Sequence, residues 1–122
     1  MHYFFDLDHT VIDSSHRQIT RADGSLDLAA WVRNNTRENI MGDSLLPLAD
    51  QWRRVDRKGA TIIICTARVM GEHDYEYLRA NGLRWDACLS RPIGDSTPDA
   101  ELKERMVRRY AQTRPMSWAR FC

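Results

Sequence analysis

Residues 60–65, Ala-Thr-Ile-Ile-Ile-Cys, form an unbroken apolar, largely β-branched run that directly follows Gly59. A run without polar alternation is typical of a parallel strand that helices cover on both faces. A second strand is expected at residues 2–8, whose end turns acidic, and a third at residues 85–89. Helix signals separate these runs, at residues 44–57, 71–80 and 97–110. Strands that alternate with helices predict a three-layer α/β fold, in which helices cover both faces of a central parallel sheet.

Two of the predicted helices carry clear boundary signals. The helix over 44–57 has apolar residues at helical spacing, Ser44 as its expected cap and Pro47 in its first turn. In the helix over 97–110, Thr97 is the expected cap. Between the first strand and these helices, residues 13–43 are polar, rich in turn signals and contain two short helical patterns, at 27–34 and 36–41. We expect residues 13–43 to form a small cap or flap over a site.

The composition excludes several classes of protein. The chain has 122 residues, of which 43% are apolar and 29% charged, which suits one globular domain over residues 1–122. No apolar run approaches the roughly 18 residues of a membrane span, and the start lacks a signal peptide's basic residues, so we expect a cytoplasmic protein without membrane contact. Three cysteines, none in CxxC spacing, predict neither a disulfide framework nor a structural zinc site.

Polar side chains follow the first two predicted strands. Asp6 and Asp8 end the first strand, and Thr66 and Arg68 follow the second. Because the carboxyl ends of parallel strands meet at one sheet edge, we expect these residues to lie together, with Lys103 nearby. Two carboxylates at a strand end suit one Mg²⁺ ion, while a hydroxyl, backbone amides and a lysine suit a phosphate. The sequence therefore predicts a magnesium-assisted phosphate site.

These residues resemble the motifs of the haloacid dehalogenase superfamily of phosphotransferases. Residues 4–10, Phe-Phe-Asp-Leu-Asp-His-Thr, resemble its first motif, DxDxT after an apolar strand. Residues 62–68, Ile-Ile-Ile-Cys-Thr-Ala-Arg, resemble its second motif, and Lys103 fits its third. Residues 91–99 with Lys103 are similar to the narrower RPxGDxxxD…K stretch of the 3′-phosphatase domain of phage polynucleotide kinases. The resemblance covers residues 2 to about 110 and implies a Rossmann-like, haloacid dehalogenase-like fold.

The resemblance implies a catalytic role for three residues. It makes Asp6 the nucleophile that takes the phosphoryl group as an aspartyl phosphate. It makes Asp8 the acid that protonates the leaving oxygen and the base that then activates water. Lys103 would neutralise the phosphate. The implied activity is a magnesium-dependent phosphomonoester hydrolase acting on a nucleotide or on a polynucleotide 3′-phosphate.

The resemblance also implies ligands for the substrate and the metal. Thr66 and the backbone after Asp6 would bind the phosphate, and Arg68 and Arg91 would orient the nucleotide part of the substrate. Mg²⁺ would be held by the Asp6 carboxylate and the Asp8 carbonyl. The implied partner is a phosphorylated nucleotide or a phosphorylated nucleic-acid end.

The chain departs from the family pattern at its end. The family's fourth motif is an apolar strand that closes in one or two aspartates, beyond the third-motif lysine. Here no Asp or Glu follows Glu104, and residues 111–122 show no strand pattern. We therefore expect an atypical tail, a sheet without its last strand, and a shortened or altered phosphatase with weakened metal binding. An uncovered helix face at Leu102, Met106 and Tyr110 would then favour self-association.

Three alternatives share some of these features. One is a truncated, catalytically impaired haloacid dehalogenase-like protein. A receiver-type phosphoacceptor signalling domain also has paired acids, a threonine and a lysine, but it needs an aspartate at the end of a middle strand, and Asp50 lies within a helical pattern. A nucleic-acid-binding module would use residues 101–122, whose six basic and two acidic residues give +4 in a chain of net charge +1. That stretch contains no recognisable nucleic-acid-reading motif.

Overall fold

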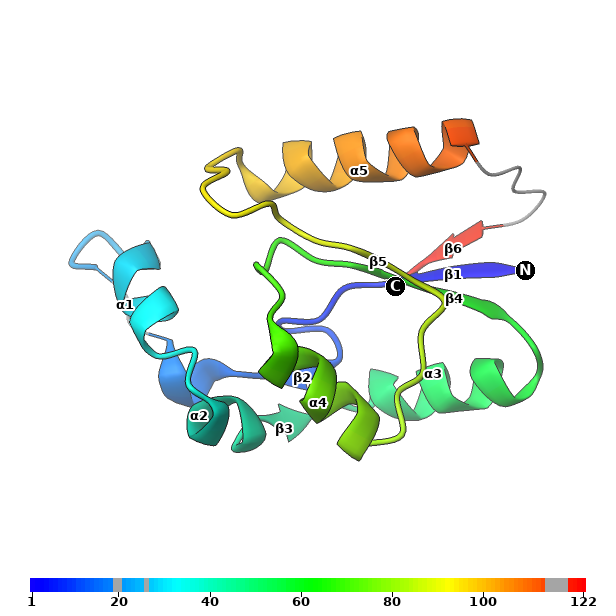
Figure 1. Ribbon diagram of the computed structural model, residues 1–122, viewed down its shortest axis with the longest axis horizontal. Helices are drawn as coiled ribbons and strands as arrows, with labels where there is room; N and C mark the ends of the chain where they lie inside the picture. The colour runs from blue at the N-terminus through cyan, green and yellow to red at the C-terminus, as the bar shows by residue number, and fades with distance from the viewer. Residues whose placement is uncertain (19–20, 26, 114–118) are drawn as a thin grey trace.

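The computed structural model describes residues 1–18, 21–25, 27–113 and 119–122. Within them, a four-stranded parallel sheet has the strand order β5-β4-β1-β6. Its members are β1 (His2–Phe5), β4 (Thr61–Cys65), β5 (Ala87–Leu89) and β6 (Ala119–Phe121). Helix α5 (Asp99–Thr113) lies along one face, and α3 (Leu48–Arg57) and α4 (Glu72–Ala80) lie along the other (Figure 1). The predicted three-layer α/β fold is confirmed.

The apolar strands form the core because their side chains alternate between the two faces of the sheet. In the register of β1 with β4, Phe4 pairs with Ile63 and Phe5 with Ile64. Phe4 and Ile63 belong to the cluster under α5, whereas Phe5 and Ile64 belong to the cluster under α3 and α4. All four side chains are buried. Burial on both faces explains why the run at 60–65 has no polar alternation.

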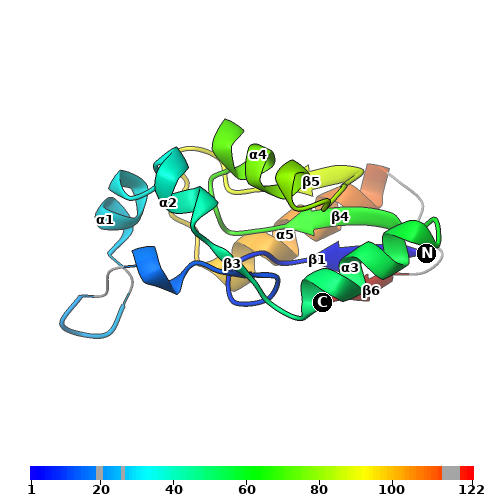
Figure 2. The same cartoon turned by 90° about the horizontal axis from the view of Figure 1, so that it is seen from below.

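Residues between the first strand and α3 form a separate group of short elements. They are β2 (Ile12–Asp13), the 3-10 helix η1 (Ser15–Arg17), α1 (Leu28–Arg33), α2 (Arg37–Met41) and β3 (Ser44–Leu45). Figures 1 and 2 show α1 and α2 beyond the sheet edge at which β1 and β4 end. This is the edge where the sequence predicts the site, and the assignment of residues 13–43 as a cap or flap stays a prediction.

The helix predicted over 44–57 begins at Leu48, so the prediction was wrong for its first turn. Ser44 does not cap this helix, because Ser44–Leu45 forms strand β3 and pairs antiparallel with β2. The Leu46 N–H extends this pairing by donating to the Val11 carbonyl at 2.8 Å. Helical spacing is a local signal, and it cannot show that a distant segment offers the backbone a strand partner.

The prediction that the sheet lacks its last strand is also wrong. Ala119–Phe121 forms β6 and pairs in parallel with β1. The Cys122 N–H donates to the Phe4 carbonyl at 2.8 Å, and the Phe121 ring stacks on Phe4 with centroids 4.7 Å apart. Backbone pairing and one aromatic contact thus stabilise a strand too short to show an apolar pattern. Residues 114–118 of the predicted tail lie outside the described residues.

The face of α5 that was expected to be uncovered is in contact with the sheet. Leu102 and Tyr110 are buried, and Met106 packs against the core cluster that contains Phe4 and Ile63. The Tyr110 ring meets the Phe4 ring edge-on, with centroids 6.0 Å apart. Because the α5-facing side chains of the sheet cover this surface, it is not available for the self-association that we expected from it.

Two further expectations concern signalling and membrane contact. Asp50 lies in the first turn of α3 with most of its side chain exposed, so it cannot be the strand-end acceptor of a receiver-type domain.

Across the described ranges, no helix combines the length and apolar character needed to cross a membrane.

Candidate active site

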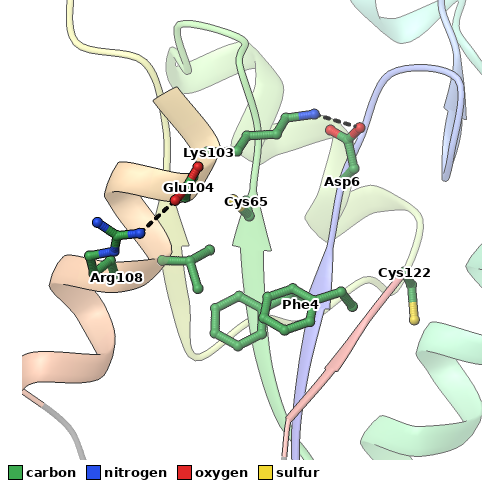
Figure 3. A pocket seen from close by; sticks show the side chains of 9 residues that line it. Phe4, Asp6, Cys65, Lys103, Glu104, Arg108 and Cys122 are labelled. Carbon is green, nitrogen blue, oxygen red and sulfur yellow. Dashed lines mark hydrogen bonds and ion pairs between the residues drawn. The ribbon is translucent and has the colours of Figure 1, made fainter. Parts of the chain in front are cut away.

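Asp6 and Lys103 meet at the carboxyl end of β1. Lys103, on the second turn of α5, donates from Nζ to Asp6 Oδ2 at 2.8 Å, although the two residues are 97 positions apart. The Leu7 N–H donates to the other carboxylate oxygen, Oδ1, also at 2.8 Å. The side chains of Lys103 and Asp6 are 30% and 27% exposed, so solvent reaches both. Figure 3 shows the two groups pointing toward one another, as the motif order predicts.

Asp8 lies two residues further on and is paired with Arg68. Arg68 donates from Nη2 to Asp8 Oδ1 at 2.5 Å and from Nε to Oδ2 at 3.2 Å, and the Ser14 hydroxyl donates to Oδ1 at 2.6 Å. Burial opposes ionisation of Asp8, but the hydrogen bonds and charge of Arg68 outweigh it and hold the pKa of Asp8 below its usual value. At neutral pH Asp8 is therefore a carboxylate in this arrangement.

A group of buried charges behind Asp8 was not anticipated from the sequence. Arg68 Nη1 donates to Asp74 Oδ1 at 2.7 Å, and Arg17 donates to both oxygens of Asp43 at 2.9 Å. The Trp31 ring covers both guanidinium groups, with its centroid 4.3 Å from Arg17 Cζ and 5.7 Å from Arg68 Cζ. None of the five residues is more than 8% exposed. The group links the 13–43 segment to the Asp8 side of the site.

Little in the sequence could have identified these partners. Asp74 stands in the first turn of α4, where an acidic residue is expected for capping alone, and its Oδ2 does accept the Gly71 N–H at 2.8 Å. Arg17 and Asp43 are 26 positions apart and follow no motif. A buried arginine has the same sequence signal as an exposed one.

Thr66 lies at the carboxyl end of β4 and is buried. Its Oγ1 accepts the Arg68 N–H at 3.0 Å, and its own N–H donates to the Leu89 carbonyl at 2.9 Å. These bonds fix the loop that carries Arg68 and do not use the proton of the threonine hydroxyl. The assignment of Thr66 as a phosphate ligand and of Arg68 as a nucleotide ligand stays a prediction.

Arg91 joins three segments near the same edge. It donates from Nε to the Ala67 carbonyl, from Nη1 to the Asp95 and Thr97 carbonyls, all at 2.8 Å, and from Nη2 to Asp99 Oδ1 at 2.7 Å. The loop after β4, the loop before α5 and the first residue of α5 are thereby connected. The predicted contact of Arg91 with a nucleotide stays a prediction.

A cavity of about 600 Å³ opens beside Asp6 and Lys103, between α5 and the sheet (Figure 3). Its other lining residues are Phe4, Cys65, Glu104, Val107, Arg108, Phe121 and Cys122. Burial raises the pKa of the Cys65 thiol to about 11, so this thiol stays protonated and is a poor nucleophile. Asp6, by contrast, offers a carboxylate that a neighbouring cation holds in place.

The oxygen donors at this edge fit Mg²⁺. Asp6 and Asp8 are carboxylates at the end of one strand, and Mg²⁺ is commonly held by one or two carboxylates together with water and substrate phosphate. In the part of the chain that the structure describes, no group of three or more His, Cys, Asp or Glu side chains gathers that could hold a metal. Lys103 and Arg68 already pair with the two carboxylates. The donor set therefore suits an ion that takes its remaining oxygen ligands from water or from a bound phosphate.

Comparison with known proteins shows which protein family the sequence matches. Residues 1–104 match the family model described as bacteriophage T5 5′-deoxynucleotidase. The 5′-deoxynucleotidase of Escherichia phage T5 is 44% identical over 84 residues, which cover 66% of this chain and 34% of the phage protein. The chain thus spans about a third of the length of the curated relative that it matches.

One solved structure bears on the fold alone. A haloacid dehalogenase-like family hydrolase from Streptococcus pneumoniae superposes with a TM-score of 0.61 at 13% sequence identity, covering 98% of this chain and 73% of that chain. The haloacid dehalogenase-like fold predicted from the motifs is confirmed by this likeness. The narrower resemblance to the phosphatase domain of phage polynucleotide kinases stays a prediction.

Proposed function

The chain belongs to the bacteriophage T5 5′-deoxynucleotidase family, and on that premise we propose that it hydrolyses the 5′-phosphate of deoxynucleotides. The observation that carries the proposal is the Asp6–Lys103 pair, an anionic nucleophile held 2.8 Å from a cation at the sheet edge. The name of the phage relative favours a 5′-phosphate over the 3′-phosphate suggested by the resemblance of residues 91–99.

In the first step, a carboxylate oxygen of Asp6 attacks the substrate phosphorus, and the bond from phosphorus to the sugar's 5′ oxygen breaks. The products are an aspartyl phosphate and a deoxynucleoside, whose 5′ oxygen takes a proton from Asp8. Lys103 offsets the repulsion between an anionic nucleophile and an anionic substrate. Mg²⁺, held by the Asp6 carboxylate and the Asp8 carbonyl, would supply further neutralisation of phosphate charge.

In the second step, a water oxygen attacks the phosphorus while the Asp8 carboxylate takes the water's proton. The bond from phosphorus to Asp6 breaks, which releases inorganic phosphate and restores the Asp6 carboxylate. Arg68 favours the anionic form of Asp8 that this step needs. The first step needs the protonated form of Asp8. Solvent or the substrate's phosphate monoanion supplies this proton, and the negative charge of the bound phosphate raises the proton affinity of Asp8.

The 13–43 segment is proposed as the cap over this site. Its Trp31 and Arg17 belong to the buried charge group that also contains Arg68, so the segment is anchored next to Asp8. A cap in this place would limit the access of water to the reacting phosphate and strengthen the charge interactions there.

Phosphate release from deoxynucleoside 5′-monophosphates, deoxynucleoside 3′-monophosphates and a 3′-phosphorylated oligonucleotide, each with Mg²⁺, tests the proposal. We expect the fastest release from the 5′-monophosphates, and no release by Asp6→Asn, which keeps the side-chain shape but removes the anionic nucleophile. An unfolding curve confirms that the variant is folded. Release by Asp6→Asn at the wild-type rate would refute the mechanism, and a preference for 3′ ends would support the polynucleotide kinase resemblance instead.

A further inference from the structure

We propose that Arg91 is a positioning residue that holds Lys103 beside Asp6 by tying the start of α5 to the loop after β4. The inference rests on the proposed function, because it assigns Arg91 a part in assembling that site. It differs from the expected role of Arg91 as a ligand of the nucleotide.

The first support is the number of hydrogen bonds that the guanidinium already makes. Four of its five N–H groups donate to Ala67, Asp95, Thr97 and Asp99 at 2.7–2.8 Å. A phosphate or carboxylate is recognised by two parallel N–H groups of one arginine. With one N–H remaining, Arg91 cannot form such a fork with a substrate unless it gives up a contact within the protein.

The second support is where these contacts lie in the chain. Ala67 stands between Thr66 and Arg68, in the loop that follows β4. Asp99 is the first residue of α5, and Lys103 follows it by one helical turn. The side chain of Arg91 is only 15% exposed and its bonds to the Ala67, Asp95 and Thr97 carbonyls are partly buried, whereas the bond to Asp99 is exposed. Arg91 therefore sets where the helix begins relative to the loop, and hence where Lys103 Nζ lies.

A neighbouring arginine provides a matched control. Arg105 also connects α5 to the loop before it, through a bond from Nη2 to Asp95 Oδ2 at 2.9 Å. Its side chain is 47% exposed and it has this one partner among the described residues. An exposed ion pair of this kind adds little to stability. Arg105→Lys should therefore leave α5 in place, whereas Arg91→Lys removes a planar fork that one ammonium group cannot replace.

Amide hydrogen exchange on the full chain tests this placement without any need for catalysis. In Arg91→Lys, the amides of the first turns of α5, including the Leu102 N–H that donates to Pro98, should exchange about tenfold faster. Amides of α3 and all amides of Arg105→Lys should exchange at the wild-type rate. If Arg91→Lys does not fold, Arg91→Gln, whose single amide cannot reach all four acceptors, should give the same local acceleration. Unchanged exchange in α5, or equal acceleration in α3 and α5, would overturn the proposal.

Steady-state kinetics with a deoxynucleoside 5′-monophosphate separates positioning from substrate binding. A displaced Lys103 should lower kcat by about 10²-fold in Arg91→Lys while KM changes little. A raised KM with kcat retained would make Arg91 a substrate ligand and overturn the proposal. Absence of activity in the wild-type chain would instead count against the proposed function, and the exchange comparison would still decide the role of Arg91.

Discussion

The Arg68 guanidinium donates to both carboxylate oxygens of Asp8 and, through its remaining terminal nitrogen, to Asp74. The arginine side chain is 1% exposed and the Asp8 side chain 23% exposed, so Asp8 is where a buried charge group reaches solvent. Asp8 thus enters a reaction as an anion, and a substrate must raise its proton affinity before it can act as an acid.

Asp8→Asn should slow hydrolysis of a deoxynucleoside 5′-monophosphate by about 10²–10⁴-fold, because the leaving alkoxide then receives no proton. With p-nitrophenyl phosphate, whose leaving phenolate needs no proton, the first step should stay fast and the second should be slow. Stopped-flow absorbance should therefore show a burst of one p-nitrophenolate per protein chain. A loss below about threefold on the nucleotide would show that Asp8 is not the general acid.

Arg68→Gln should destabilise the protein strongly, because it leaves Asp8 and Asp74 without their buried partner. The expected loss in the free energy of unfolding at neutral pH is about 3–5 kcal/mol. Arg84→Gln is the matched control, since Arg84 bridges Asp56 and Asp86 with a side chain that is 52% exposed. There the loss should be about 0–1 kcal/mol. Urea unfolding of both variants measures the difference.

The effect of Arg68→Gln should depend on pH in a defined direction. The folded-state pKa of Asp8 is lowered, so its pairing with Arg68 stabilises the fold above the unfolded-state value of about 4 and is lost as pH falls through the folded-state value. Wild type and Arg68→Gln should therefore converge in stability in acid. A difference in the free energy of unfolding between wild type and Arg68→Gln that stays constant from neutral pH into acid would contradict the pairing of Asp8 with Arg68.

Lys103→Ala should reduce kcat/KM by about 10²–10³-fold, the usual cost of removing a group that stabilises developing phosphate charge. Lys58→Ala is the control, because Lys58 is an exposed residue at the end of α3, before the opposite end of β4. Steady-state kinetics on both variants compares the two lysines of the chain. Equal losses would refute a specific role for Lys103.

Mg²⁺ should bind the free protein weakly and more tightly when inorganic phosphate is present. The reason is that Asp6 and Asp8 are both paired with cations and that phosphate supplies the additional oxygen ligands. Calorimetric titration with and without phosphate measures both affinities. If Mg²⁺ instead binds tightly without phosphate, and this tight binding is lost in Asp95→Asn or Asp99→Asn, a further carboxylate completes the metal site.

The sequence was sufficient for the parts of the fold that depend on local pattern. The apolar runs of β1 and β4 carry their own burial signal, and the edge where they end follows from parallel topology. The Asp6–Lys103 contact was therefore predictable, although 97 positions separate the residues. Strands β3 and β6 were not, because two or three residues paired with a distant segment leave no periodic pattern.

The buried charges lay beyond sequence reasoning for a different reason. Arginine and aspartate are mostly exposed in proteins, so Arg17, Asp43 and Asp74 are expected at the surface. Their burial is stable because each pairs with an opposite charge, Arg17 with Asp43 inside the 13–43 segment and Asp74 with Arg68 of the β4 loop, and because Trp31 covers the two guanidinium groups. That arrangement exists only after the 13–43 segment has docked against α4 and the β4 loop.

Acid-quenched mass spectrometry of the chain during turnover tests the central claim most directly. Asp8→Asn, mixed with p-nitrophenyl phosphate and Mg²⁺, should accumulate the mass of one phosphoryl group on the peptide that contains Asp6, because formation of the intermediate is retained and its hydrolysis is slow. The double variant with Asp6→Asn should carry no added mass. A phosphoryl group on another residue, or phosphate release from wild type with none ever found on Asp6 in either protein, would contradict the account.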